Sequence, residues 1–237
     1  MQRHRRRKLY EYVVEDLAVR ILRGEYRPGD TLPNEEALCR EMEVSRGVLR
    51  EATKVLVQKG LIELGPKTGT RVTARSRWNL FDPDLLLWKL KVGNRFEFLQ
   101  DVTEVRAIIE SEAARFAAER ASPGDVEKIE AAFEKMEEAL GRSRYDYEAY
   151  VQIDMAFHTA ILEACRNDLL ARIGFAMRHA VLQARSLDTR DIRIQRESLP
   201  FHRAILDAVA AREPEAAHSA SRRMFEHVWR NIPRKKE

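Results

Sequence analysis

The sequence predicts a mainly α-helical chain with an N-terminal winged helix-turn-helix and a C-terminal all-helical bundle. Apolar residues recur at helical spacing through most of the 237 residues, and short strands are indicated only near residues 61–74. The charges are uneven, since Met1–Trp78 holds 17 Lys and Arg against 11 Asp and Glu, whereas the rest holds 25 against 27. Such asymmetry indicates a module that binds a polyanion, joined to a neutral module with another task.

The composition points away from membranes and secretion. No apolar run approaches the length of a membrane span, and the start, MQRHRRRKLYEY, has no apolar signal core behind its charges. The two cysteines, Cys39 and Cys165, lie far apart in helical patterns, which argues against a disulfide framework. We therefore expect a cytoplasmic protein that does not bind membranes.

Two helices are predicted before residue 43. The first, Lys8–Arg23, carries an apolar stripe at helical spacing, and the chain turns by Gly29. The second follows Pro33–Asn34, with Glu35 and Glu36 in its first turn, where acids favour a helix start.

The third predicted helix, Ser45–Lys59, is the one around which the first domain is organised. A connection of only two residues separates it from the second helix, which is typical of a helix-turn-helix. Ser45 stands at the N-cap position, so Arg46 and Gly47 fall in the first exposed turn. The face opposite the apolar stripe carries Arg46, Arg50, Lys54 and Lys59. Arginine in this position suits guanine edges in a DNA major groove, although a solvated basic face on an ordinary helix is the alternative.

A β-hairpin is predicted after this helix. Gly60 ends the helix, LIEL and TRVTA are short strands, and GPKTG forms the turn between them. The tip of such a wing can press into the adjacent minor groove with Lys67 or Arg71 near phosphates. Residues 1–76 therefore predict a winged helix-turn-helix domain that binds DNA.

Residues 77–94 are predicted to connect two domains. The stretch is rich in Leu and Trp, so a short helix that starts near Asp84 is expected instead of a flexible linker. Residues 95–237 predict only helices, with Ser122 as the cap of one of them and breaks near Asn167, Pro200 and Glu213–Pro214. The predicted helices are Phe96–Ala121, Pro123–Leu140, Tyr145–Cys165, Asp168–Leu187, Glu197–Arg212 and Pro214–Ile232. Such a bundle can hold a cavity lined by side chains from facing helices.

Three side chains of the bundle form a candidate metal site. Asp154 and His158 are four residues apart and lie on one helical face, and His202 opens the corresponding face of a later helix. Carboxylate and imidazole groups that converge from separate helices suit a divalent metal such as Zn, Ni or Mn. An ordinary contact on a helix surface is the alternative at this spacing.

The sequence argues against an enzyme. It contains no HExxH, no G-x-S-x-G, no glycine-rich phosphate loop and no CxxC. A metal-dependent hydrolase could use Asp154, His158 and His202, but no separate candidate base lies near them in sequence. A purely architectural DNA binder is a third possibility, and the large neutral helical domain argues against it.

The first domain resembles the DNA-binding domain of the GntR transcription-factor family. The shared features are LP before the second helix, S-R-x-x-x-R-E-A in the third, G-L-I after it and G-T-x-V in the wing. The resemblance implies that Arg46, Arg50 and Gly69 make the principal DNA contacts and that Ser45 helps at a phosphate. The DNA-binding residues are thus expected to be Ser45, Arg46, Gly47, Arg50, Lys67 and Gly69.

Two departures from the GntR pattern bear on which operator is bound. Glu36 stands where the family often has Arg, and Lys67 stands where it often has Gly.

The stretch WNLFDPDLLLWKL resembles the FCD branch of this family, especially its repressors of galactonate and related sugar-acid operons. The resemblance implies a metal held by an Asp and three His, of which Asp154, His158 and His202 match the first three. The fourth position falls on Met224, whose thioether is a poor ligand for these metals, so we expect weakened metal binding.

Arg106 matches a family arginine that points into the cavity and binds the carboxylate of the effector, a role that suits a guanidinium. A surface salt bridge to Glu110 is the alternative. The effector-binding residues are thus expected to be Arg106, Asp154, His158 and His202. His218 and His227 are more typical of surface or packing positions, and the sequence does not orient His179.

Taken together, these features predict a homodimeric transcriptional regulator. We expect it to repress genes of sugar-acid catabolism and to leave a palindromic double-stranded DNA operator when a small carboxylate effector binds the helical domain. A regulator that responds to lactate, a fatty-acid derivative or another organic acid is the alternative.

Overall fold

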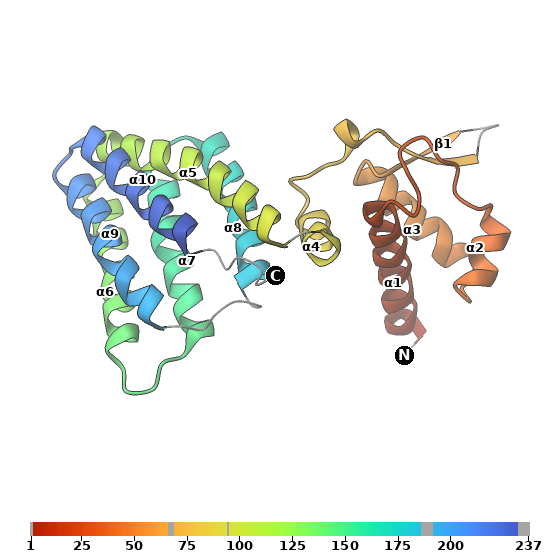
Figure 1. Cartoon of the computed structure of the whole chain (residues 1–237), viewed down its shortest axis with the longest axis horizontal. Coiled ribbons are helices and arrows are strands. Elements are labelled where there is room, and N and C mark those ends of the chain that lie inside the picture. The colour runs from red at the N-terminus through yellow and green to blue at the C-terminus, as the bar shows by residue number, and fades with distance from the viewer. Residues whose placement is uncertain (1, 66–68, 94, 186–191, 232–237) are drawn as a thin grey trace. The chain divides into compact units, whose positions relative to one another are not determined.

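The structure is a computed structural model that describes residues 2–65, 69–93, 95–185 and 192–231 (Figure 1). The side chains of residues 2–8, 95 and 179–185 lie outside this description. The chain divides into two compact units, Met1–Asn94 and Arg95–Glu237, and the helix of the predicted connector belongs to the first. Within the described residues, no helix is both long enough and apolar enough to span a membrane.

The first unit is a winged helix-turn-helix, as predicted. Its elements are α1 (Gln2–Arg23), α2 (Glu35–Glu41), α3 (Arg46–Gln58), β1 (Ile62–Gly65), β2 (Gly69–Val72), a 3-10 turn (Arg75–Arg77) and α4 (Pro83–Val92). The two strands are antiparallel, with Ile62 opposite Val72. Helices α1, α3 and α4 enclose one apolar core, which includes Leu17 of α1, Leu56 of α3 and Trp88 of α4.

Helix α3 is specified at both ends by local sequence. Ser45 is its N-cap, and the Ser45 side-chain oxygen accepts a hydrogen bond from the Val48 amide at 3.4 Å. At the other end Gly60 has a φ of +75°, and the Leu61 amide donates to the Leu56 carbonyl at 3.0 Å. This pattern is a Schellman motif, and it turns the chain from α3 directly into the wing.

Lys59 does not belong to the exposed basic face where the sequence placed it. It is the C-cap residue of α3, and only 7% of its surface is exposed. Its ammonium donates to Asp82 at 2.6 Å and to Asp84 at 2.8 Å, and it lies 5.3 Å from the Trp88 ring. Burial alone would lower the pKa of Lys59, and the two carboxylates outweigh that effect and raise it. The Lys59 ammonium therefore links α3 to the acids at the start of α4, and it does not contribute to the exposed basic face of α3.

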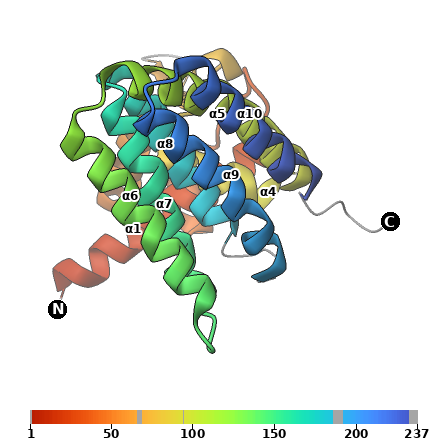
Figure 2. The same cartoon turned by 90° about the vertical axis from the view of Figure 1, so that its left-hand side faces the viewer.

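The second unit is an all-helical bundle, as predicted. Its helices are α5 (Arg95–Arg120), α6 (Pro123–Gly141), α7 (Tyr147–Ala164), α8 (Asp168–Arg185), α9 (Ile192–Ala210) and α10 (Pro214–Arg230). Helix α5 packs against α7, α8, α9 and α10, and α6 packs against α7 and α9 (Figure 2). Ser122 caps α6 through a capping box with Asp125, which confirms that cap.

One predicted helix boundary in the bundle is wrong. Helix α9 begins at Ile192 instead of Glu197 and continues through Pro200, near which a break was predicted. Proline removes one backbone donor and usually ends a helix. Here Ser198 and His202 are buried on either side of Pro200, so tertiary packing outweighs that local cost. The predicted helix ends at Leu187 and Ile232 lie outside the described residues.

We expect Gly60→Ala to destabilise the first unit. A left-handed backbone at an L-residue costs about 1–2 kcal/mol. A Cβ at Gly60 would in addition lie 2.1 Å from the backbone oxygen of Arg77, so we expect a total loss of roughly 3–5 kcal/mol. Hydrogen exchange of the α3 segment in the full-length chain, followed by mass spectrometry, measures this loss.

Gly24→Ala is the matched control for this prediction. Gly24 also follows a helix with a φ of +81°, but a Cβ there meets nothing within 4 Å. Gly24→Ala should therefore lose only the stability that a left-handed backbone costs, about 1–2 kcal/mol. Equal protection of α3 in the two variants would contradict the close packing at Gly60.

Candidate functional site

The first exposed turns of α3 present two arginines beside one carboxylate. The side chains of Arg46 and Arg50 are each 67% exposed. Arg50 donates from Nε and Nη2 to the two carboxylate oxygens of Glu35 in α2, at 2.9 and 3.2 Å. Nε of Arg46 lies 3.8 Å from the same carboxylate. Both predicted DNA-contacting arginines therefore face solvent with an acidic partner from the preceding helix.

Helix α3 and the wing line one groove of about 330 Å³. Glu35 and Arg50 contribute from the helices, and Leu64 and Thr70 contribute from the two strands. Gly69 begins β2 with a φ of +71°, a conformation that glycine adopts readily, and Lys67 lies outside the described residues. A cationic helix edge beside a hairpin suits duplex DNA, where arginine reads base edges and a wing contacts phosphates.

The bundle brings Asp154, His158 and His202 together in its interior. The first two lie one turn apart on α7 and the third lies on α9, and all three are at most 5% exposed. One ligand atom from each lies within 4.8 Å of the others. Nε2 of His158 is 3.7 Å, and Nε2 of His202 is 3.3 Å, from Oδ1 of Asp154. The contact is buried, unlike the surface contact considered as the alternative.

The hydrogen bonding of His202 tests whether a cation fits this cluster. Nδ1 of His202 lies 2.9 Å from the backbone oxygen of Ser198, which can only accept, so we assign the proton to Nδ1. The lone pair of Nε2 then faces Asp154. Nε2 is buried and has no hydrogen-bond partner among the described residues. A lone pair and a carboxylate oxygen repel unless a proton or a metal ion lies between them, so the donor set fits a divalent cation.

Arg106 and Glu110 form an ion pair at the spacing that the sequence indicates, but the pair is buried and not at the surface. Nε of Arg106 donates to Oε1 of Glu110 at 2.6 Å, and each side chain is 4% exposed. Oε2 of Glu110 lies 2.8 Å from Nδ1 of His158, a short contact that is not aligned as a hydrogen bond. Arg106 is thereby linked through Glu110 to the candidate metal cluster.

Arg178 of α8 is a further member of this network, and it was not predicted from the sequence. It is 1% exposed, its Nη1 lies 3.5 Å from Oε2 of Glu110, and its Nη2 donates to the backbone oxygen of Asp154 at 3.3 Å. No local sequence pattern predicts a role for Arg178. Glu110 was predicted only as the residue one helical turn after Arg106. The network thus joins α5, α7 and α8.

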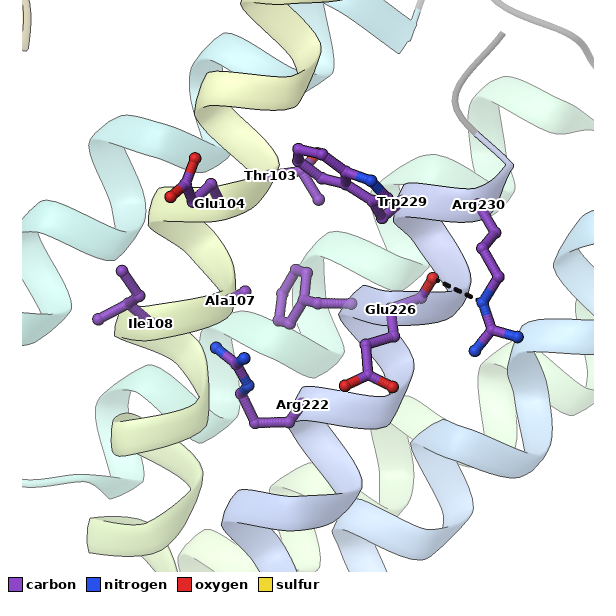
Figure 3. A pocket seen from close by; sticks show the side chains of 9 residues that line it. Thr103, Glu104, Ala107, Ile108, Arg222, Glu226, Trp229 and Arg230 are labelled. Atoms are coloured by element: carbon purple, nitrogen blue, oxygen red, sulfur yellow. Dashed lines mark hydrogen bonds between the residues drawn. The ribbon is translucent and has the colours of Figure 1, made fainter.

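A surface groove of about 400 Å³ runs between α5 and α10 (Figure 3). Ile108 and Trp229 contribute apolar surface, and Arg222 and Glu226 contribute opposite charges. Phe225 also lines the groove, and its ring lies 5.0 Å from the guanidinium carbon of Arg106 and 6.4 Å from the His158 ring. Phe225 therefore contacts both the groove and the buried network.

The remaining histidines do not join the cluster where the structure describes them. His227 packs on the Phe201 ring at 5.1 Å, and His218 is half-buried, with Nε2 3.5 Å from a Glu112 oxygen. The side chain of His179 lies outside the description. Met224, at the expected fourth ligand position, is 2% exposed in the apolar core of the bundle.

Two protein families match most of the chain. Residues 9–72 match the gntR family of bacterial regulatory proteins, and residues 101–227 match the FCD domain.

Among curated relatives, the galactonate operon transcriptional repressor of Escherichia coli K12 is 32% identical, over 93% of this chain and 95% of the relative. The Glc operon transcriptional activator of the same strain is 30% identical, over 96% of this chain and 90% of the relative.

Two solved structures share the fold. The Listeria monocytogenes regulator Lar aligns with a TM-score of 0.60 at 21% identity, over 95% of this chain and 97% of its own. Escherichia coli McbR/YncC aligns with a TM-score of 0.52 at 20% identity, over 94% and 96%.

The matched domains, the identity to the curated relatives and the winged helix-turn-helix with its helical bundle agree with one another. The chain belongs to the FCD branch of the GntR family, whose members are bacterial transcriptional regulators that bind DNA operators and small-molecule effectors, and it is not an enzyme.

Proposed function

We propose that the chain is a homodimeric repressor of sugar-acid catabolic genes, which leaves a palindromic operator when a carboxylate effector binds the bundle. The buried network around Arg106 is the observation that carries the effector half of this proposal. The repressor of a galactonate operon among the relatives favours a sugar acid, and the activator of the Glc operon keeps the sign of regulation open to test. We place the protein in the cytoplasm because its operator would lie there.

The DNA half of the proposal rests on the first turns of α3. Arg46 and Arg50 would read base edges, while the Ser45 and Gly47 region would approach a phosphate at the helix N-terminus. Gly69 and Lys67 would contact the backbone from the wing. A dimer would present two such surfaces to the half-sites of a palindrome.

The effector half rests on the geometry of Arg106. Its Nε is bound to Glu110, and among the described side chains neither terminal nitrogen has a hydrogen-bond partner. Those two nitrogens form the fork that matches a carboxylate. We therefore propose that the acid group of the effector binds there, near Phe225 and the histidine cluster. Lactate, a fatty-acid derivative or another organic acid would bind the same two nitrogens. Titration of operator release with each acid therefore identifies the effector.

The proposal also includes a metal site. Asp154, His158 and His202 would hold a divalent ion such as Zn, Ni or Mn. The bound ion would supply a Lewis-acidic site for oxygen atoms of the effector. With Met224 at the fourth position the protein offers three ligands, so we expect weaker binding than at a site with four. The imidazole of His202 is already oriented for this role by the Ser198 carbonyl.

Arg46→Ala and Arg50→Ala should each weaken operator binding by about 5- to 150-fold, the usual loss for a bidentate base contact. The measurement uses a duplex selected from a random-sequence library by the wild-type protein, and footprinting of that duplex should show a pseudo-palindrome. Arg115→Ala, a partly exposed arginine of α5, is the control. Unchanged affinity in both α3 variants would remove the assignment of the recognition helix.

Arg106→Lys should keep operator binding and weaken release by the effector at least about tenfold, because lysine keeps the charge but loses the fork. Lysine is preferred to alanine, since removal of one partner of a buried ion pair costs about 3–5 kcal/mol. Release from the selected duplex would be titrated with galactonate, gluconate, glucuronate and lactate. Arg115→Lys, in the same helix, should respond like the wild type. Normal release in Arg106→Lys would reduce Arg106 to a structural ion pair.

His202→Ala should lower the affinity for Zn, Ni or Mn by at least about tenfold, because loss of a ligand should exceed the loss of an outer-shell contact. Met224→His should raise the affinity, provided that α10 brings this position to the cluster. Elemental analysis and isothermal titration measure both effects, and His218→Ala is the control for loss of a histidine elsewhere. Tight metal in the wild type that His202→Ala leaves unchanged would rule out this site.

A further inference from the structure

Glu35 is an acidic residue that lies beside both arginines of the proposed DNA-contacting surface. It opens α2, and its carboxylate reaches across to α3, where it binds Arg50 through two hydrogen bonds and lies beside Arg46. The hydrogen bond from Arg50 lowers the pKa of Glu35, so the carboxylate is charged at neutral pH. One negative charge thus offsets one of the two positive charges on the exposed edge of α3.

The edge of the guanidinium that Glu35 occupies decides what Arg50 can still bind. A guanidinium has one edge formed by Nε and Nη2 and a second edge formed by Nη1 and Nη2. Glu35 accepts from the first edge at 2.9 and 3.2 Å. The second edge keeps two parallel donors, which is the pattern that guanine O6 and N7 accept. Readout of guanine is therefore compatible with the Glu35 contact, and the contact fixes the plane of the guanidinium.

The Glu35 carboxylate has the opposite effect on the binding of a DNA phosphate. Phosphate binding depends mainly on charge, and affinity for any duplex falls with salt in proportion to the number of charges neutralised. The Glu35 carboxylate repels phosphate and lowers the net charge beside Arg46 and Arg50. The same residue thus favours base readout through geometry and disfavours sequence-independent binding through charge.

We propose that Glu35 determines the sequence specificity of this regulator, by orienting Arg50 for a base edge and by suppressing the attraction of Arg46 and Arg50 to DNA of any sequence. The proposal rests on the assignment of these arginines to the DNA contact. Glu35 is not among the DNA-binding residues expected from the sequence. In this proposal a residue of α2 orients an arginine of α3.

Glu35→Gln tests the proposal, with Glu41→Gln as the control from the same helix. Both changes remove one carboxylate of α2 that is paired with an arginine. Glu41 pairs with Arg20 of α1 and has no ion pair with Arg46 or Arg50 among the described residues. Binding is measured with full-length protein, on the duplex selected by the wild type and on a shuffled duplex of equal length, across a range of salt concentrations.

We expect Glu35→Gln to lower the ratio of selected-duplex affinity to shuffled-duplex affinity by about tenfold, the order of one misplaced bidentate base contact. Its salt dependence on the shuffled duplex should steepen by about 0.9 in the log–log slope, the effect of one further phosphate contact. Glu41→Gln should leave the ratio unchanged. In an Arg50→Ala background, Glu35→Gln should lower the ratio less than it does in the wild type, because the group that Glu35 orients is gone and only the charge beside Arg46 remains.

Two results would overturn the proposal. One is an equal change of the ratio in Glu35→Gln and Glu41→Gln, which would mean that loss of any carboxylate of α2 has the same effect. The other is a full effect of Glu35→Gln in the Arg50→Ala background. Failure of the DNA assignment itself is distinguishable, because Arg46→Ala and Arg50→Ala would then bind the selected duplex as the wild type does.

Discussion

The buried carboxylate of Glu110 is the contact on which the polar interior of the bundle depends. An ionised carboxylate in an apolar core is costly unless cationic or donor groups surround it. Oε1 of Glu110 accepts a hydrogen bond from Arg106 of its own helix, and Oε2 lies 2.8 Å from Nδ1 of His158 on α7 and 3.5 Å from Nη1 of Arg178 on α8. Side chains of three helices thus converge on a single carboxylate, which places the candidate metal ligands close to the candidate effector arginine.

Glu35 has the same kind of partners in the first unit but a different solvent environment. Its two arginines are mostly exposed, so water and salt screen the interaction, and a DNA duplex can compete for the cationic groups. The buried network therefore suits a role in holding a structure, whereas the exposed pair suits exchange with a ligand. Burial, more than residue identity, separates the two roles.

The C-terminus of α3 shows how the helix that is proposed to contact DNA is held by the rest of its unit. Gly60 turns the chain into the wing, Thr73 in the strand region donates to the Gly60 carbonyl, and Lys59 binds the acids at the start of α4. The wing, α3 and α4 therefore meet at two consecutive residues. A change in the position of α4 would reach α3 directly through the Lys59 ion pairs.

Local patterns in the sequence determined the helices, the N-cap Ser45, the C-terminal glycine of α3, the wing and the two-part organisation, because short-range hydrogen bonds and apolar periodicity decide these features. The pairing of Asp154 with His158 was also local. Tertiary structure alone decided that Lys59 turns inward, that α9 continues through Pro200, that Arg178 joins the network and that Glu35 binds both arginines. Each of these depends on groups from separate helices, and a linear pattern carries no record of which charges meet after the chain has folded.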